Sequence, residues 1–204
     1  MSRYTGPRLR KMRALGVHLP GLSGKTLERR AHPPGQHGAE RRGKKSDYAL
    51  QLTEKQKVRH NYGVTEKQMR RLMKESLASK MGTGDKLIEL LERRLDNVVF
   101  RAGFARTIPA ARQLVNHRHL KVNGRSVDIA SYRLRKGDVI EFRAKSGKLD
   151  CVTESLEMMG PYRPDWLTVD PKKRQVVVSE LPDGNAAPFP VTVQLVVEYY
   201  SRLL

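Results

Sequence analysis

The fold is decided by residues 94–142, which read RLDNVVFRAGFARTIPAARQLVNHRHLKVNGRSVDIASYRLRKGDVIEF. The first half of this stretch repeats apolar residues every three or four positions, which is typical of amphipathic helices. The second half alternates apolar and polar residues around Asn123 and Gly124, a strong signal for a β-hairpin. Two helices followed by a small antiparallel sheet are therefore predicted, and this combination belongs to the α+β class.

The two helices are predicted on either side of Gly103. The first starts after Asp85, and the second follows Thr107 and tolerates Pro109 in its first turn. The residues expected to be buried on these helices are Leu87, Leu91, Leu95, Val98 and Ala102 on the first, and Ile108, Ala111, Leu114 and Val115 on the second. At 100° per residue, Arg93, Arg94, Asn97 and Arg101 are predicted to share another face of the first helix.

Further strands and a last helix are predicted beyond the hairpin. Residues 139–143 and 174–181 are rich in β-branched residues, which favours strands. The tail from residue 191 to residue 204 has a helical apolar stripe, although its β-branched residues also suit a strand, and we favour the helix.

Upstream of the central stretch, the tetrapeptide TEKQ occurs at residues 53–56 and again at residues 65–68. A threonine followed three positions later by glutamine forms a capping box, so both threonines are predicted to cap helices. The first helix is expected to end near residues 61–63, and the second to run from Glu66 to about Met81.

Positive charge is concentrated near the N-terminus. The chain has 204 residues and a net charge of +19, which predicts a polyanionic partner. Residues 1–60 hold 15 Lys and Arg against 4 Asp and Glu. We interpret residues 1–45 as an irregular basic arm, ordered mainly by its partner.

The remaining composition restricts the cellular setting. No apolar run approaches the roughly 20 residues that span a bilayer, so no membrane partner is expected. The single cysteine, Cys151, cannot form an intrachain disulfide, which fits a reducing compartment. We therefore expect a cytoplasmic protein.

Metal binding and catalysis are both disfavoured by the residues present. His32 and His37 have a plausible zinc spacing, but no cysteine lies nearby to complete four ligands, so neither a metal nor a cofactor is predicted. The sequence RLD at residues 94–96 is similar to the catalytic motif of pseudouridine synthases, yet it lies inside a predicted helix. Asp96 is therefore expected to pair with a nearby arginine, and no enzymatic activity is predicted.

Basic residues gather where the second helix meets the hairpin. They come from three successive elements, and the open N-terminus of the helix capped by Thr107 favours a phosphate. Few aromatic residues are present, so recognition of RNA by shape and phosphate contacts is predicted, with DNA binding by a helix-turn-helix as the nearest rival. The predicted RNA-binding residues are Arg93, Arg94, Asn97, Arg101, Arg106, Thr107, Arg112, His117, Arg118, His119, Lys121 and Asn123, together with Gln36, His37, Arg41, Arg42, Lys44 and Lys45 in the arm.

Residues 94–142 resemble the S-four RNA-binding domain. The flanking motifs narrow the resemblance to the bacterial-type S-four family of small-subunit ribosomal proteins, and the match covers nearly the whole chain. The motifs are PPGQHG at 33–38, SDY at 46–48, EKQKVRHNYGV at 54–64, PDWL at 164–167 and QLVVEYYSR at 194–202.

The resemblance implies a ribosomal protein of a bacterium or a plastid. It implies a helical domain at residues 46–92, completed by a C-terminal helix at 190–204, and an inserted RNA-binding domain at residues 93–189 with its core at 93–157. It implies primary binding of small-subunit ribosomal RNA that nucleates assembly, contact with ribosomal proteins S-five and S-three, and a place where messenger RNA enters. It also implies an influence on decoding accuracy, and some members repress their own messenger. An RNA-modifying enzyme and a stand-alone translational repressor remain the alternatives.

This chain departs from the resembled family at two places. The N-terminal cysteine cluster that binds zinc in many relatives is missing, and Arg118 stands where glycine is usual.

Overall fold

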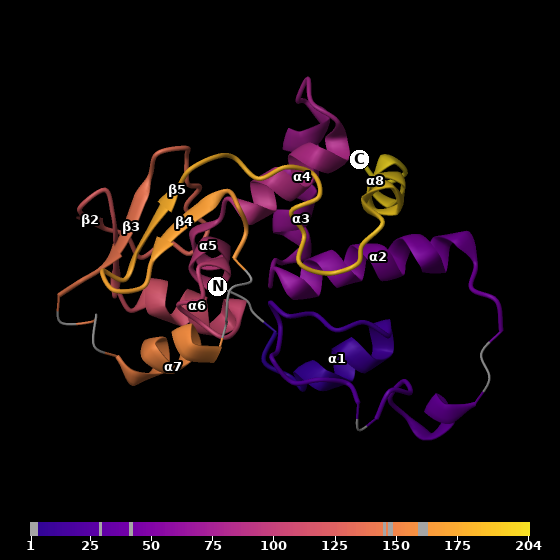
Figure 1. The fold of residues 1–204 in the computed structure, drawn as a ribbon. Coiled ribbons are helices and arrows are strands. Elements are labelled where there is room, and N and C mark those ends of the chain that lie inside the picture. The colour runs from indigo at the N-terminus through magenta and orange to yellow at the C-terminus, as the bar shows by residue number, and fades with distance from the viewer. Residues whose placement is uncertain (1–3, 29, 41–42, 145, 147–148, 159–162) are drawn as a thin grey trace. The chain divides into compact units, whose positions relative to one another are not determined.

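The computed structural model describes residues 4–28, 30–40, 43–144, 146, 149–158 and 163–204 (Figure 1). They divide into two compact units. We call residues 1–87 with 187–204 the helical unit, and residues 88–186 the sheet unit.

The helical unit is built around the packing of its long central helix against the C-terminal helix. Its elements are α1 (Arg8–Leu15), a 3-10 turn (Gln36–Ala39), α2 (Asp47–Asn61), α3 (Glu66–Leu77), the start of α4 (Thr83–Glu92) and α8 (Val193–Ser201). Helix α8 packs on α2 and α3, and Tyr62, Met69, Met73 and Val196 are fully buried. The predicted C-terminal helix is therefore confirmed.

A partly buried polar contact joins three of these helices, α2, α3 and α8. The Tyr200 hydroxyl donates to Glu66 Oε1 at 2.8 Å, and Lys55 Nζ donates to Glu66 Oε2 at 2.9 Å. Burial acts to raise the pKa of Glu66, but these two hydrogen bonds lower it below its ordinary value. Because the folded-state pKa is depressed, the contact stabilises the fold at neutral pH, and this stabilisation is lost as pH falls through that folded pKa.

Residues 1–45 hold more regular structure than the predicted irregular arm. Helix α1 ends at Gly16, whose φ of 68° allows a left-handed cap, and buries Met12. Leu19 and Leu22 are also buried, so this segment contributes apolar side chains to the core of the helical unit.

One of the two predicted capping boxes is confirmed. Thr65 accepts from the backbone of Gln68, whose side chain accepts from the backbone of Thr65, and α3 starts there. The box at Thr53 is wrong, because α2 already begins at Asp47 with Ser46 as its cap, and the Thr53 hydroxyl donates to Ala49 within the helix. Helix α3 ends at Leu77, before the predicted Met81.

The long helix predicted up to Gly103 is in fact two helices, α4 and α5 (Leu95–Arg101). Arg94 is extended between them, with φ −68° and ψ 139°. The backbone N–H groups of Leu95 and Asp96 donate to the carbonyls of Tyr132 and Ala130, at 2.8 and 3.1 Å. Backbone partners distant in sequence therefore replace the intrahelical bonds at the break.

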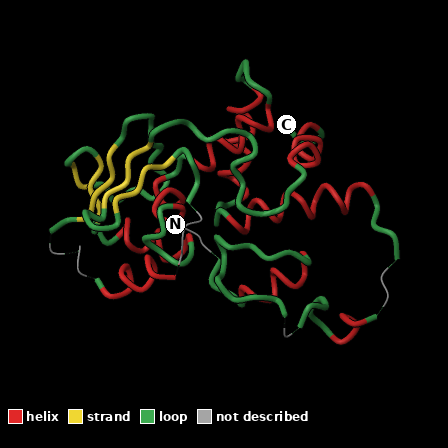
Figure 2. Tube along the Cα trace, in the orientation of Figure 1, coloured by secondary structure: helices red, strands yellow, loops and turns green. Residues whose placement is uncertain are grey.

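The described residues of the sheet unit form a five-stranded antiparallel sheet in the order β2-β1-β3-β5-β4, beside helices α5 and α6 (Figure 2). The remaining elements are α6 (Ile108–Asn116), β1 (Leu120–Val122), β2 (Arg125–Ser126), β3 (Val139–Phe142), α7 (Asp150–Met158), β4 (Leu167–Asp170) and β5 (Gln175–Val178). The α+β class, the hairpin and the strands at 139–142 and 175–178 are confirmed, whereas α7 and β4 were not predicted.

The hairpin turn has the geometry that its sequence predicts. Asn123 and Gly124 both have positive φ, 49° and 76°, as a type I′ turn requires. The Asn123 side chain also bridges to β3, accepting from Val139 N at 2.9 Å and donating to Asp138 at 2.9 Å. This side chain therefore holds the hairpin closed against β3.

Candidate nucleic-acid interface

A buried carboxylate, Asp96, holds two of the arginines that the sequence assigned to RNA. Arg94 donates to its two oxygens at 3.0 and 2.8 Å, and Arg112 donates to Oδ2 at 3.1 and 2.7 Å. The predicted pairing of Asp96 with an arginine is therefore confirmed. Because Asp96 is fully buried, its carboxylate has no access to a substrate and cannot serve as a catalytic nucleophile.

A second buried carboxylate, Glu92, lies in the same unit. Asn97 donates to its side chain at 2.9 Å, and Arg101 approaches its Oε2 at 3.2 Å while donating to the Ala186 carbonyl at 2.7 Å. Arg93 is paired with Glu89 at 2.6 Å.

The structure overturns the prediction that Arg93, Arg94, Asn97 and Arg101 share one face of a single helix. The helix breaks at Arg94, and both Arg94 and Asn97 are buried. Removing one partner of a buried ion pair is strongly destabilising, so the buried carboxylates of Asp96 and Glu92 require their arginine partners in the folded sheet unit. RNA contact by Arg93, Arg94, Asn97, Arg101 and Arg112 stays a prediction.

The N-terminus of α6 forms the exposed part of the predicted site. Thr107 caps the helix by accepting from Ala110 N at 3.4 Å. Arg106, which precedes it, has 47% of its side chain exposed and donates to Glu154 on α7 at 2.7 Å. A phosphate at this helix end would meet the positive end of the helix dipole and the Arg106 guanidinium.

The other end of α6 carries two imidazoles and a strained arginine. Arg118 has φ 60°, a region that favours glycine, and its exposed side chain pairs with Asp128 at 2.9 Å. His119 Nδ1 lies 2.9 Å from the Ser146 hydroxyl, and its ring centre lies 6.0 Å from that of His117. Lys121 on β1 is half-buried and pairs in register with Glu141.

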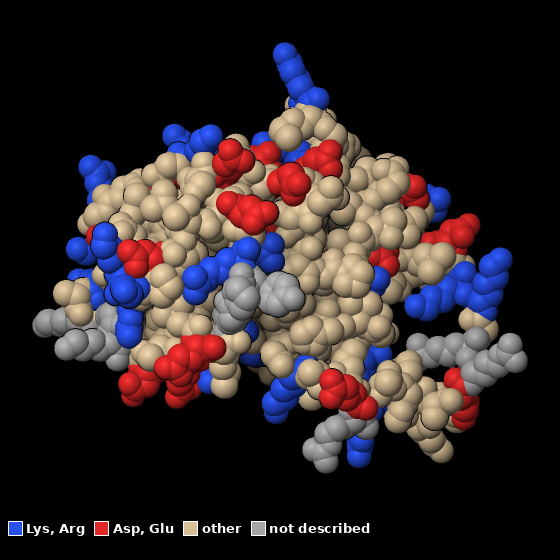
Figure 3. All heavy atoms as spheres, in the orientation of Figure 1, with Lys and Arg blue, Asp and Glu red and all other residues tan. Residues whose placement is uncertain are grey.

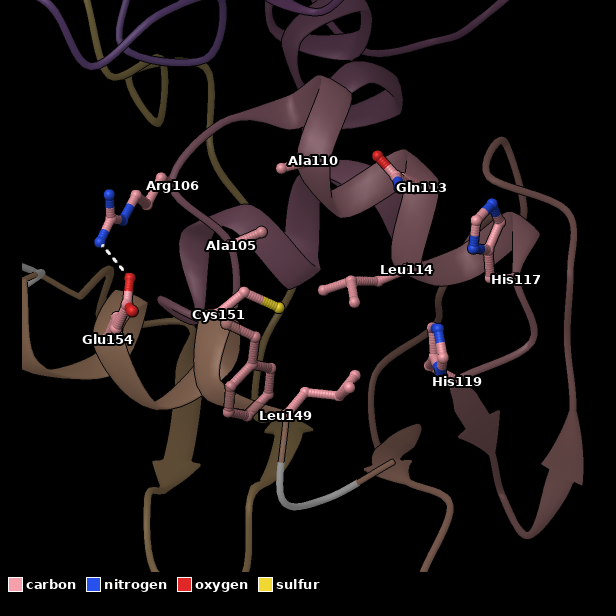
Figure 4. Close-up of a pocket in the computed structure, with 11 residues that line it drawn as sticks. Ala105, Arg106, Ala110, Gln113, Leu114, His117, His119, Leu149, Cys151 and Glu154 are labelled. Carbon is pink, nitrogen blue, oxygen red and sulfur yellow. Dashed lines mark hydrogen bonds and ion pairs between the residues drawn. The ribbon is translucent and has the colours of Figure 1, made fainter. Parts of the chain in front are cut away.

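An open groove of about 390 Å³ lies between α6 and α7 (Figure 4). Leu114 and the Cys151 sulfur point into it, while Arg106 lies at one side and His119 at the other. The complete lining is Phe104, Ala105, Arg106, Ala110, Gln113, Leu114, His117, His119, Leu149, Cys151 and Glu154. The groove therefore has an apolar floor and a polar rim.

The predicted arm residues lie in the helical unit. Gln36 and His37 are exposed in the 3-10 turn, and His37 pairs with Glu40 at 2.6 Å. Lys44 and Lys45 are exposed, whereas Arg41 and Arg42 lie outside the described residues. Among the residues that the structure describes, no group of three or more His, Cys, Asp and Glu side chains could hold a metal ion.

Sequence reasoning missed a basic face on α3. Lys67, Arg70, Arg71 and Lys74 are all exposed, and the structure shows no ion pair for them among the residues it describes. Their spacing of three and four places them on one face of the helix, opposite the buried Met69. A search of the sequence for cations at the helical spacing used for apolar stripes would have identified these four residues.

The two units also differ in charge. The helical unit holds 22 Lys and Arg against 8 Asp and Glu, a net charge of +14, whereas the sheet unit holds 18 against 13, a net charge of +5. Carboxylates gather over α7 in Figure 3, where Asp150, Glu154 and Glu157 are exposed. Positive charge available to a polyanion is therefore greatest on the helical unit.

The pairing of Arg106 with Glu154 yields a prediction with opposite effects for the two partners. Arg106→Ala is expected to lower the log–log salt slope of RNA binding by about one, because one phosphate contact is lost. Glu154→Gln releases Arg106 and is expected to strengthen binding without lowering that slope. Filter binding across salt concentrations checks both, with thermal unfolding as the control. If both variants had the affinity and salt slope of the parent, the N-terminus of α6 would not be part of the RNA-binding surface.

Comparison with known proteins places these features in a family. Residues 3–92 match the family described as ribosomal protein S4/S9 N-terminal domain, and residues 93–140 match the S4 domain. The chain is 58% identical to the small ribosomal subunit protein uS4 of Methylobacillus flagellatus over the full length of both proteins. It is 54% identical to uS4B of Nitrosomonas europaea over 99% of both proteins, and 52% identical to uS4 of a Synechococcus species over the full length of both. None of the helices in the described ranges has the length and apolar character needed to cross a membrane.

Proposed function

The chain belongs to the uS4 family of small ribosomal subunit proteins, as the resemblance predicted, and from this we propose that it is a structural constituent of the small ribosomal subunit that binds ribosomal RNA. The observation that carries the proposal is the net charge of +14 on the helical unit, with four exposed cations on one face of α3. Such a face suits the phosphates of a structured RNA, which are recognised by position and shape.

We further propose that the chain is a primary binder that nucleates subunit assembly. Both units offer groups for phosphate: the α3 face in one, and the α6 N-terminus with Arg106 in the other. Two linked contact surfaces raise affinity because the second contact forms within an existing complex. Binding early, before other proteins order the RNA, requires such affinity from the protein alone.

Further partners and roles are proposed by analogy with the family that this chain resembles. We propose contact with ribosomal proteins S-five and S-three, an effect on decoding accuracy, and contact with entering messenger RNA through residues 40–48. The exposed Lys44 and Lys45 support the last point, since a positively charged surface can bind the phosphates of a single strand. Translation of structured messengers by subunits carrying Lys44→Ala and Lys45→Ala would test it; an unchanged rate would count against it.

The proposed function is tested by sedimentation and by binding to RNA. The protein is expected to co-migrate with the small subunit in cell extract at high magnesium. Purified protein is expected to bind a fragment spanning the 5′ domain of small-subunit RNA without other proteins. A free protein in the extract would argue against a structural constituent, and binding only after other proteins are added would argue against a primary binder.

A further inference from the structure

We infer that the groove between α6 and α7 receives one unpaired nucleotide of the bound RNA, with the base on the apolar floor and its phosphate at the Arg106 end. This inference rests on the proposed function, because it takes RNA as the partner. This site would contact a base, whereas the other candidate surfaces offer contacts only to phosphates.

The apolar floor of the groove suits the flat face of a base. The buried Phe104 and Leu114 contribute to its lining. Leu149 and Cys151 line it from the α7 side (Figure 4). Its volume of about 390 Å³ is within the range of roughly 300–1,000 Å³ typical of small-molecule sites. Unstacked bases are commonly held on such surfaces when proteins recognise single-stranded parts of an RNA.

The rim supplies polar groups suited to a base. Gln113 and His117 lie one turn apart on α6, and both line the groove. Gln113 is exposed and lines the groove, so the donor and the acceptor of its side-chain amide can reach a base edge. The imidazoles of His117 and His119 add faces on which a base can stack.

The charge at the Arg106 end favours a nucleotide over an uncharged ligand. Arg106 and the N-terminus of α6 lie at the same side of the groove, where both attract an anion. The Glu154 carboxylate accepts a hydrogen bond from Arg106 at 2.7 Å, so an incoming phosphate must replace that carboxylate. A purely apolar occupant, such as a side chain of a partner protein, would leave this ion pair intact.

Cys151 provides a direct readout, because it is the single cysteine of the chain, it is exposed, and it lines the groove. N-ethylmaleimide is expected to alkylate Cys151 at least about tenfold more slowly in the complex with the 5′ domain RNA fragment than in the free protein, since base stacking is worth about 1–3 kcal/mol. An equal rate in a complex shown to be saturated would overturn the inference. Protection in the intact subunit but not with RNA alone would also overturn it, and would assign the groove to a protein partner.

A second experiment separates the base from the phosphate. Cys151→Leu places a larger apolar side chain in the groove without changing charge, and Cys151→Ser is the matched comparison that leaves the groove open. Cys151→Leu is expected to weaken RNA binding about tenfold with an unchanged salt slope, because no phosphate contact is lost. Cys151→Ser is expected to lose less affinity than Cys151→Leu, because a hydroxyl leaves the groove open. Equal binding by the two variants, with thermal midpoints near that of the parent, would overturn the inference.

The two proposals can fail separately. If the parent protein does not bind the RNA fragment, the proposed function fails and the nucleotide site fails with it. If the parent binds but Cys151 is alkylated at the free rate and Cys151→Leu binds normally, only the nucleotide site fails.

Discussion

Replacing Asp96 with alanine is expected to lower the free energy of unfolding of the sheet unit by about 3–5 kcal/mol. The Asp96 carboxylate is fully buried and accepts hydrogen bonds from Arg94 and Arg112, whose side chains are 6% and 13% exposed. Removing it takes away the carboxylate that both guanidiniums share in a place with little water. Asp96→Asn is expected to fall between the parent and the alanine variant, because an amide retains the shape and one acceptor.

Urea unfolding followed by tryptophan fluorescence measures this effect in the correct unit. Trp166 is the single tryptophan of the chain, and it is buried in the sheet unit. The matched control is Asp128→Ala, which breaks the exposed pair with Arg118 and is expected to cost at most about 1 kcal/mol. Equal losses for Asp96→Ala and Asp128→Ala would show that the buried pairs contribute no more than a surface ion pair.

The elements that sequence reasoning found correctly depend on neighbours in the chain. The turn at Asn123–Gly124 needs two residues that tolerate positive φ, and the cap at Thr65 needs a glutamine three positions later. Both requirements are local and therefore visible in the sequence. The box at Thr53 failed because an equally local but earlier cap, Ser46, starts the same helix sooner.

The break at Arg94 could not be predicted because its cause is distant in sequence. A continuous apolar stripe runs through the break, so periodicity alone favours one helix. The carbonyls that end the helix belong to Ala130 and Tyr132, more than thirty residues later. The break also changes which way Arg94 points, and so it moves this arginine from a predicted RNA face to a buried ion pair.

The same limitation shaped the predicted site. A basic residue is equally basic in sequence whether it faces solvent or a buried carboxylate. Arg106 and Arg112 lie six residues apart, yet Arg106 is half exposed and Arg112 is held by Asp96. Which of these arginines is exposed is therefore known only from the structure. On α3 the structure shows four exposed cations, and their helical spacing in the sequence already places them on one face.

The α3 face offers the largest expected effect on RNA binding. Each phosphate contact contributes about 0.9 to the log–log salt slope of binding to a duplex. Four lost contacts would therefore lower the slope by about 3–4, which corresponds to roughly three orders of magnitude in affinity at about 0.1 M salt. The four side chains are exposed, so their replacement is expected to change the free energy of unfolding by only about 0.5 kcal/mol each.

We therefore expect the quadruple variant Lys67→Gln, Arg70→Gln, Arg71→Gln and Lys74→Gln to fold normally and to lose most of its affinity for the 5′ domain RNA fragment. The matched control exchanges lysine and arginine at the same positions (Lys67→Arg, Arg70→Lys, Arg71→Lys and Lys74→Arg), which preserves every charge. If phosphate attraction is the cause, the exchanged protein retains the parental salt slope, because a counterion is released by either cation. If the exchanged protein loses affinity as well, α3 recognises bases or a fixed guanidinium geometry. A glutamine variant with the parental slope would remove α3 from the RNA surface altogether and leave the α6 N-terminus and residues 36–45 as the sites to test.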